Sequence, residues 1–126
     1  MESINSFLQG FEFIESDRLP IISLDKFGRF NVNMAARRLL GVKPYDTLVI
    51  GYNAKNEEIA VIPSKYANGL PGASFSKYAM DKRYYMSARA LAKNYKLIGQ
   101  HHLFVYDRGM SDGSAFIFRR STGLDD

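Results

Sequence analysis

The sequence predicts a mainly β fold with short helices, built from two tandem copies of one unit: strand, turn, strand, helix and hairpin. Short runs of β-branched and aromatic residues alternate with Gly, Asn and Pro turn signals. This order of signals occurs twice, on either side of a stretch rich in small residues. Each unit exposes an apolar face on every element, so a second unit is needed to bury it.

The first copy, residues 19–64, begins with two short strands around a tight turn. Residues 20–25 and 29–32 are rich in apolar residues. Gly28 lies in the turn between them, where glycine adopts positive φ without a steric penalty.

A short helix and a hairpin complete the first copy. Asn33 is a suitable N-cap for a helix over residues 34–40, and Gly41 stands where a left-handed residue ends such a helix. The apolar run at residues 47–50 then pairs with residues 58–62 across a polar loop.

The pattern begins again after a linker at residues 65–76. The second copy, residues 77–120, contains a predicted helix over residues 88–96 and a hairpin that joins residues 102–106 to residues 115–118.

The two copies align with one gap. Residues 80–87 match residues 24–33 if positions 27–28 are deleted, so that Ser87 replaces Asn33 as the helix cap. The hairpins align at a constant offset of 55 residues, which predicts loops of equal length.

Residues 1–18 form an acidic and aromatic N-terminal extension, and residues 121–126 form a short polar tail. Apolar spacing favours a helix in the first part of the extension. Residues 11–15 equally fit the start of a strand. We expect the extension to cover the core; a partner-binding arm is the alternative.

Composition predicts a folded protein with an acidic partner. The chain has 126 residues, 46% of them hydrophobic, a net charge of +4 and a pI near 9.4. No apolar run approaches the roughly 20 residues that cross a bilayer, and no signal peptide is evident, so no membrane association and a cytoplasmic location are expected. The chain contains no cysteine, which excludes disulfides.

Three segments of the first copy carry a family resemblance. They are the turn with Asp25, Gly28 and Arg29, the run from Arg37 to Val42, and the pattern Asp46-x-Leu48-x-Ile50. In order and spacing they resemble the DNA-binding domain of the AbrB family of bacterial regulators, which includes MazE-type antitoxins and tandem MraZ-type regulators. The match covers about a third of the chain. It departs from the family at Asn33, where a proline is usual.

The resemblance implies an AbrB-like swapped-hairpin β-barrel formed by two tandem ββαββ copies. The barrel would close within one chain as a pseudo-dimer, or with a second chain as a homodimer. The implied function is a sequence-specific DNA-binding transcription regulator of bacterial or phage origin that acts on double-stranded DNA.

In that family, basic residues from the turn and the helix contact DNA. The resemblance therefore nominates one set of residues in the first copy: Lys26, Arg29, Arg37 and Arg38. The degenerate second copy offers a different set: Lys82, Arg83, Arg89 and Lys93. Arginine suits this task because its planar fork bonds two acceptors at once. The copies should therefore read DNA unequally, with most base contacts from the first.

Two other interpretations remain open. The basic residues could form a solvated face without a ligand. The barrel could instead be a protein-interaction module, antitoxin-like or an inhibitor of a host protein, which binds through its aromatic second copy.

No catalytic motif, metal site or cofactor is predicted, so we expect no enzyme. His101 and His102 are adjacent, and neighbouring residues on a strand point to opposite faces, which separates them as metal ligands. Asp25 and Asp81 recur in the two turns, where we expect them to accept hydrogen bonds from turn amides.

Overall fold

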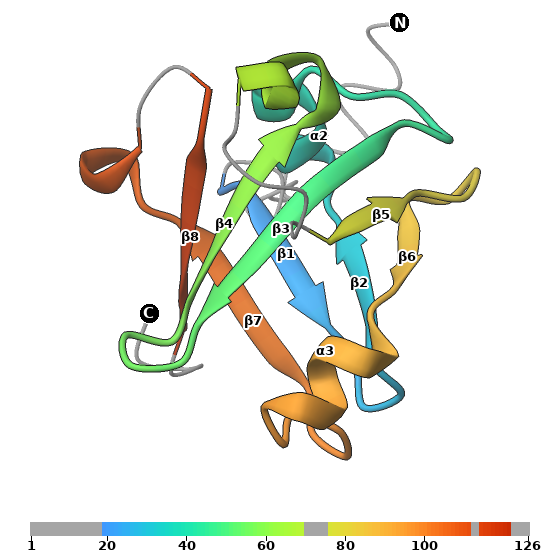
Figure 1. Cartoon of the computed structure of the whole chain (residues 1–126), viewed down its shortest axis with the longest axis vertical. Helices are drawn as coiled ribbons and strands as arrows, with labels where there is room; N and C mark the ends of the chain where they lie inside the picture. The colour runs from blue at the N-terminus through green and yellow to red at the C-terminus, as the bar shows by residue number, and fades with distance from the viewer. Residues whose placement is uncertain (1–18, 70–75, 112–113, 122–126) are drawn as a thin grey trace, which may run out of the picture.

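The computed structural model describes residues 19–69, 76–111 and 114–121 (Figure 1). These residues form a nearly closed, barrel-like antiparallel sheet of eight strands with a few short helices, which confirms the predicted mainly β class. Among the described residues, no helix is long and apolar enough to cross a membrane. The predicted N-terminal extension at residues 1–18 and all but the first residue of the tail lie outside the described residues.

The elements follow the predicted order. The first half contains β1 (Ile21–Leu24), β2 (Arg29–Val32), α2 (Met34–Leu40), β3 (Thr47–Asn53), β4 (Glu58–Pro63) and the 3-10 helix η2 (Ser64–Gly69). The second half contains β5 (Lys77–Ala79), β6 (Tyr85–Ser87), α3 (Arg89–Asn94), β7 (His102–Tyr106), the 3-10 helix η3 (Arg108–Met110) and β8 (Phe116–Arg120).

The two halves interlock through their hairpins. The strand order is β5-β3-β4-β8-β7-β1-β2-β6, so the β3–β4 hairpin of the first half pairs with β5 and β8 of the second. The β7–β8 hairpin pairs in turn with β1 and β4. The strand order is nearly symmetric: if each strand of the first half is replaced by its counterpart in the second (β1 by β5, β2 by β6, β3 by β7, β4 by β8) and the reverse, the strand pairings stay the same. The one exception is the pairing of β1 with β2, because its counterpart, β5 with β6, is missing.

Helix α2 is capped as predicted. The Asn33 side chain accepts a hydrogen bond from the Ala36 amide at 2.9 Å, and Gly41 ends the helix in the left-handed region with φ 67°. Asn33 also joins the helix to β1, since its Oδ1 accepts from the Ile21 amide and its Nδ2 donates to the Leu19 carbonyl.

The predicted cap of the second helix is wrong. Helix α3 covers Arg89–Asn94, and its N-cap residue is Ala88, which forms no side-chain cap bond. Ser87 instead ends strand β6 and pairs with Arg29. The helix therefore begins one residue later than the predicted alignment placed it.

The predicted deletion of residues 27–28 is also wrong. Asp25 accepts from the amides of Phe27 and Arg29 through Oδ1, and Asp81 accepts from the amides two and four residues further on in the same way. Both turns therefore have the same length, and they correspond at an offset of 56 residues. The predicted role of the two aspartates is confirmed.

The hairpins also differ from their predicted alignment. Val49 pairs with Lys77, and Val105 pairs with Ile21 at the corresponding place, so the first strands of the two hairpins correspond at an offset of 56 residues and not 55. The loops are unequal, at residues 54–57 and 107–115. Loop length leaves no periodic signal in the apolar pattern, which explains the error.

One shared core lies inside the sheet. It is formed by apolar side chains from both halves that are almost completely buried, among them Ile22, Phe30, Ile59, Met86, Phe104 and Phe118. Because strands of each half supply neighbouring positions, neither half encloses a core of its own.

Candidate nucleic-acid interface

A two-stranded antiparallel ribbon, β2 with β6, carries the centre of the candidate interface. Phe30 pairs with Met86, and both side chains are buried in the core. Side chains alternate along a strand, so the neighbours of this pair face outward. These neighbours are Arg29, Asn31, Tyr85 and Ser87.

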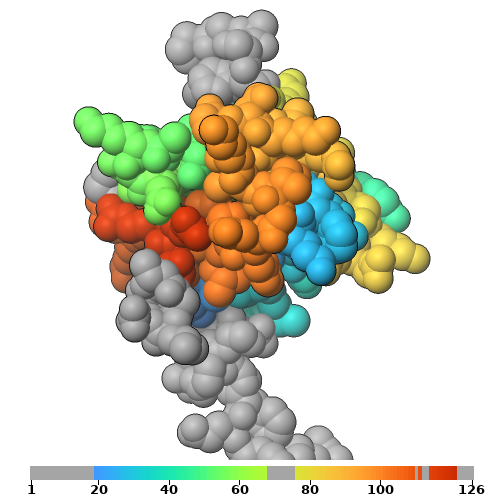
Figure 2. Space-filling model, turned by 90° about the horizontal axis from the view of Figure 1, so that it is seen from below, coloured from blue at the N-terminus to red at the C-terminus, as the bar shows by residue number. Residues whose placement is uncertain are grey.

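A turn–helix corner lies at each end of this ribbon. The turn at residues 25–29 leads into β2 and packs on α3, whose preceding residue Ala88 donates to the Gly28 carbonyl at 2.8 Å. The turn at residues 81–85 leads into β6 and packs beside α2, with a bond from the Val32 amide to the Tyr84 carbonyl. We name them the Gly28 corner and the Tyr84 corner. Each combines a turn of one half with the helix of the other, and Figure 2 shows the turn of the Gly28 corner against the segment that contains α3.

Arg29 links the two corners across the ribbon. Its Nε donates to Asp25 Oδ2 at 2.8 Å, and its guanidinium carbon lies 4.8 Å from the ring centre of Tyr85. Arg83 approaches the same ring at 5.9 Å. The Asp25 bond uses Nε alone, and 49% of the Arg29 side chain is exposed, so its terminal nitrogens remain accessible to an acceptor.

Arg37 is held more tightly at the Tyr84 corner. Its guanidinium carbon lies 3.9 Å from the ring centre of Tyr84, and its Nε donates to the Val32 carbonyl at 2.8 Å. Such a stack adds about 0.5–1 kcal/mol at an exposed site. The Nε edge of the Arg37 guanidinium is therefore already used in a hydrogen bond within the protein.

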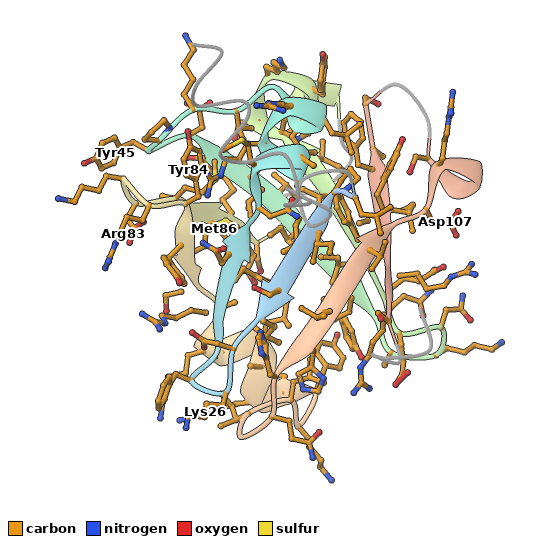
Figure 3. The ribbon with its side chains drawn as sticks, turned by 180° about the vertical axis from the view of Figure 1, so that it is seen from behind. Lys26, Tyr45, Arg83, Tyr84, Met86 and Asp107 are labelled. Atoms are coloured by element: carbon orange, nitrogen blue, oxygen red, sulfur yellow. The ribbon has the colours of Figure 1, made fainter. Side chains whose placement is uncertain are left out.

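The other predicted basic residues of the Tyr84 corner are exposed. Arg38 contacts the Met34 sulfur at 3.2 Å on the outer side of α2, and Lys82 and Arg83 are exposed in the turn. Figure 3 shows Arg83 and Tyr84 together on this side of the molecule, with Tyr45 next to them.

The Gly28 corner is packed differently. A Cβ at Gly28 would lie 3.1 Å from the Arg89 Cα and 3.5 Å from the Ala92 Cβ, so turn and helix touch through small residues. Arg89 and Lys93 are exposed on α3. Lys26 lies 5.2 Å from the ring centre of the exposed Phe27 at the tip of the turn.

The structure therefore sorts the eight nominated residues into two groups. The Gly28 corner carries Lys26, Arg29, Arg89 and Lys93; the Tyr84 corner carries Arg37, Arg38, Lys82 and Arg83. Figure 3 shows Lys26 and Arg83 at opposite ends of the ribbon. The sequence suggested a division between the two copies. In the structure, each group instead contains residues from both copies.

The two turn aspartates, Asp25 and Asp81, form hydrogen bonds with groups of their own turns. Partial burial acts to raise the pKa of Asp25, but hydrogen bonds from Arg29 and the Phe27 amide outweigh it, so the net pKa is lowered. Hydrogen bonds from the Tyr85 and Arg83 amides lower the pKa of Asp81. Both are therefore ionised near neutral pH and partly offset the positive charge of their corners.

Sequence reasoning missed three positioning residues. Tyr84 stacks on Arg37, Tyr85 lies between two arginines, and Asn31 Nδ2 donates to the Arg83 carbonyl at 3.2 Å. Alternation along β2 marks Asn31 as outward-facing, but the tyrosines became neighbours of these arginines only through the β2–β6 pairing.

The histidine pair lies apart from both corners. His102 is 3% exposed and its Nε2 lies 3.1 Å from the Leu97 carbonyl, whereas His101 is exposed. Burial lowers the pKa of His102, with smaller contributions from neighbouring groups. Within the described residues, no three His, Asp or Glu side chains gather as a metal site.

Comparisons of the chain with protein-family models, curated proteins and solved structures found no match. The argument for function therefore depends on the geometry and charge of this surface.

Proposed function

We propose that the protein binds double-stranded DNA through the β2–β6 ribbon and its two basic corners, as a sequence-specific transcription regulator of AbrB-like type. The observation that carries the proposal is the gathering of eight Lys and Arg side chains from four separate segments at the two ends of one short ribbon. Scattered basic residues on a solvated surface would not be expected to converge in this way.

The size of the ribbon suits a DNA groove. The four residues of β2 span about 13 Å at 3.3 Å per residue. The major groove is about 12 Å wide and accepts a two-stranded β-ribbon. The corners would then meet the phosphates on either side of the groove, while the outward side chains of the ribbon face base edges.

Arg29 is the best-placed candidate for reading a base. Asp25 fixes its guanidinium from the Nε side, and the Tyr85 ring supports one face. A fork held in this way loses little conformational freedom when it bonds guanine O6 and N7. Lys82 and Lys93 carry flexible point charges, which suit phosphates.

We also propose that the barrel is an intrachain pseudo-dimer with swapped hairpins. The near-symmetric strand order supports this, since the hairpin of each half pairs with the first strand of the other half. A single chain would then supply both corners, without a second subunit.

The test is duplex binding across a salt series, measured by fluorescence anisotropy with a mixture of genomic fragments. The variant Arg29→Ala/Arg83→Ala removes one cation from each end of the ribbon. The matched control, Lys55→Ala/Arg108→Ala, removes two exposed cations from the hairpin loops on the other side of the sheet. The ribbon variant should weaken duplex binding through the lost base contact of Arg29, and should reduce the salt slope by about 0.9 through the lost phosphate contact of Arg83.

Equal losses in the two variants would refute a localised interface. If the wild type binds no duplex at low salt while circular dichroism shows an intact fold, the DNA proposal fails and a protein-binding role for this surface becomes the better account.

A further inference from the structure

The sheet is open at one seam, between β5 and β6. In the first half the corresponding strands form a ladder, in which Ile22 pairs with Val32 and Leu24 pairs with Phe30. Strands β5 and β6 form no such ladder, and the Asp81 amide joins them only beside their turn, by a bond to the Tyr85 carbonyl at 2.9 Å.

The backbone of β5 presents free hydrogen-bonding groups to this seam. The Ser76 carbonyl and the Met80 amide bond towards β3, so the alternate residues Lys77 and Ala79 direct their backbone groups the other way. Both residues are exposed, and their N–H and C=O groups have no partner among the described residues. They form a short unpaired strand edge of the kind that accepts a further strand.

A hollow lies beside this edge. It has a volume of about 330 Å³ and is lined by side chains from β3, β5 and the segment of α3 that continues to Tyr95. The lining includes Ile50, Tyr52, Tyr78, Leu91 and Tyr95. Tyr78 lies between Lys77 and Ala79, so a residue opposite Tyr78 on an added strand would project into the hollow.

The three elements that line the hollow carry charges of one sign. Among β3, β5 and α3 there is no acidic residue, whereas Lys77, Arg89 and Lys93 are exposed. An incoming segment that carries Asp or Glu is favoured by this field.

We propose that the seam binds an extended acidic peptide of a partner protein. The peptide adds as a strand to β5 through the Lys77 and Ala79 backbone groups, places one aromatic side chain in the hollow, and directs its carboxylates to the neighbouring cations. Main-chain bonds supply affinity and the hollow selects the side chain, as in other strand-addition complexes. The seam lies apart from the outward face of the ribbon but shares Arg89 and Lys93 with the Gly28 corner; the proposal does not depend on DNA binding.

The experiment uses the full chain and a blocked, fluorescein-labelled peptide, EVEFEVE. Ala79→Pro removes the N–H that faces the seam, which an edge strand tolerates because β3 does not use it. Ala79→Thr keeps that N–H and is the matched control. We expect wild type and Ala79→Thr to bind alike, and Ala79→Pro to bind about tenfold more weakly, since one hydrogen bond of about 1–1.5 kcal/mol corresponds to that factor.

A second variant tests the hollow. Ala90 lines it from α3 and is exposed, so Ala90→Phe adds a ring at its rim. It should weaken EVEFEVE more than EVEAEVE. In amide exchange, Lys77 and Ala79 should exchange rapidly in the free protein and become protected when the peptide is added.

Three results would overturn the proposal. The first is that EVEFEVE and the basic peptide KVKFKVK bind with equal affinity, or that neither peptide binds. The second is binding that protects other amides but leaves Lys77 and Ala79 exchanging rapidly. The third is a wild-type dimer in sedimentation that Ala79→Pro converts to a monomer, which would assign the edge to a second copy of the chain.

Discussion

The Gly28 corner and the Tyr84 corner occupy corresponding places in the fold but solve the same packing problem in opposite ways. Both turns put a residue at positive φ, 87° for Gly28 and 67° for Tyr84. At the first, a glycine lets α3 approach until Ala92 almost touches the turn. At the second, a tyrosine takes the place of the glycine and stacks on Arg37 of α2. The small residues Gly28 and Ala92 thus meet in one corner, where the large residues Tyr84 and Arg37 meet in the other.

The same contrast continues at the turn tips and the strand seams. Phe27 and Arg83 correspond at the 56-residue offset, so one tip is apolar and the other is cationic. Asn33 joins β1 to α2, whereas the α3 cap Ala88 has no side chain for this task and the β5–β6 seam stays open. A repeated unit thus keeps its topology while the two copies diverge in surface chemistry.

The largest expected effect separates the two positive-φ positions. Gly28→Ala places a Cβ 3.0 Å from the Ile98 Cδ1 and 3.1 Å from the Arg89 Cα. It should lower the free energy of unfolding by about 2–4 kcal/mol, from left-handed strain and overpacking together. Tyr84→Ala adds no atom and should lose about 1–2 kcal/mol, because it removes both the Arg37 stack and the packing of a half-buried ring against the core. Urea unfolding measures both; a larger loss for Tyr84→Ala would reverse the comparison.

The next effect tests the two helix starts. Asn33→Ala removes the cap of α2 and its bonds to β1, and should cost about 1–2 kcal/mol in thermal or urea unfolding. Ser87→Ala is the control at the residue that the sequence favoured as a cap. Because Ser87 lies exposed in β6, we expect a change within about 0.5 kcal/mol. An equal cost at the two positions would restore the predicted cap.

Smaller effects should distinguish the turn tips in DNA binding. Arg83→Ala should reduce the salt slope by about 0.9, because it removes one phosphate contact. Phe27→Ala removes an exposed apolar side chain, and should weaken binding while leaving the slope unchanged. The comparison uses the same duplex at four or more salt concentrations. A change of slope in Phe27→Ala would show instead that this apolar tip supports the phosphate contacts of its neighbours Lys26 and Arg29.

The smallest expected effect concerns pH at the start of β7, where His102 Nε2 lies 3.1 Å from the Leu97 carbonyl. Burial lowers the folded-state pKa of His102 below its ordinary value of 6.5. The unfolded chain therefore binds a proton first, and stability should fall as pH drops below 6.5 until the folded pKa is reached. Melting temperatures from pH 8 to 5 should show this for wild type and for the control His101→Gln, but less for His102→Gln. Identical profiles for all three would exclude His102 as the group responsible.

Local sequence signals determined most of the elements. Helix α2 with its Asn33 cap and Gly41 stop, the turn aspartates and both hairpins could be predicted, because each depends on hydrogen bonds or apolar periodicity within a few residues. The basic character of the candidate surface was also readable from composition and from the two turns.

Only the tertiary structure decided how the two copies meet. The pairing of Tyr85 with Asn31 and the pairing of Val105 with Ile21 join segments more than fifty residues apart. The alternation of apolar and polar residues along a strand predicts which face is buried. It does not predict which strand lies next to it, because all strands share the same period of two residues and the same backbone hydrogen-bonding groups. The pairing of β2 with β6 places the turn before each strand against the helix of the other half. The Arg37–Tyr84 stack and the close approach of Gly28 to Ala92 are consequences of this arrangement.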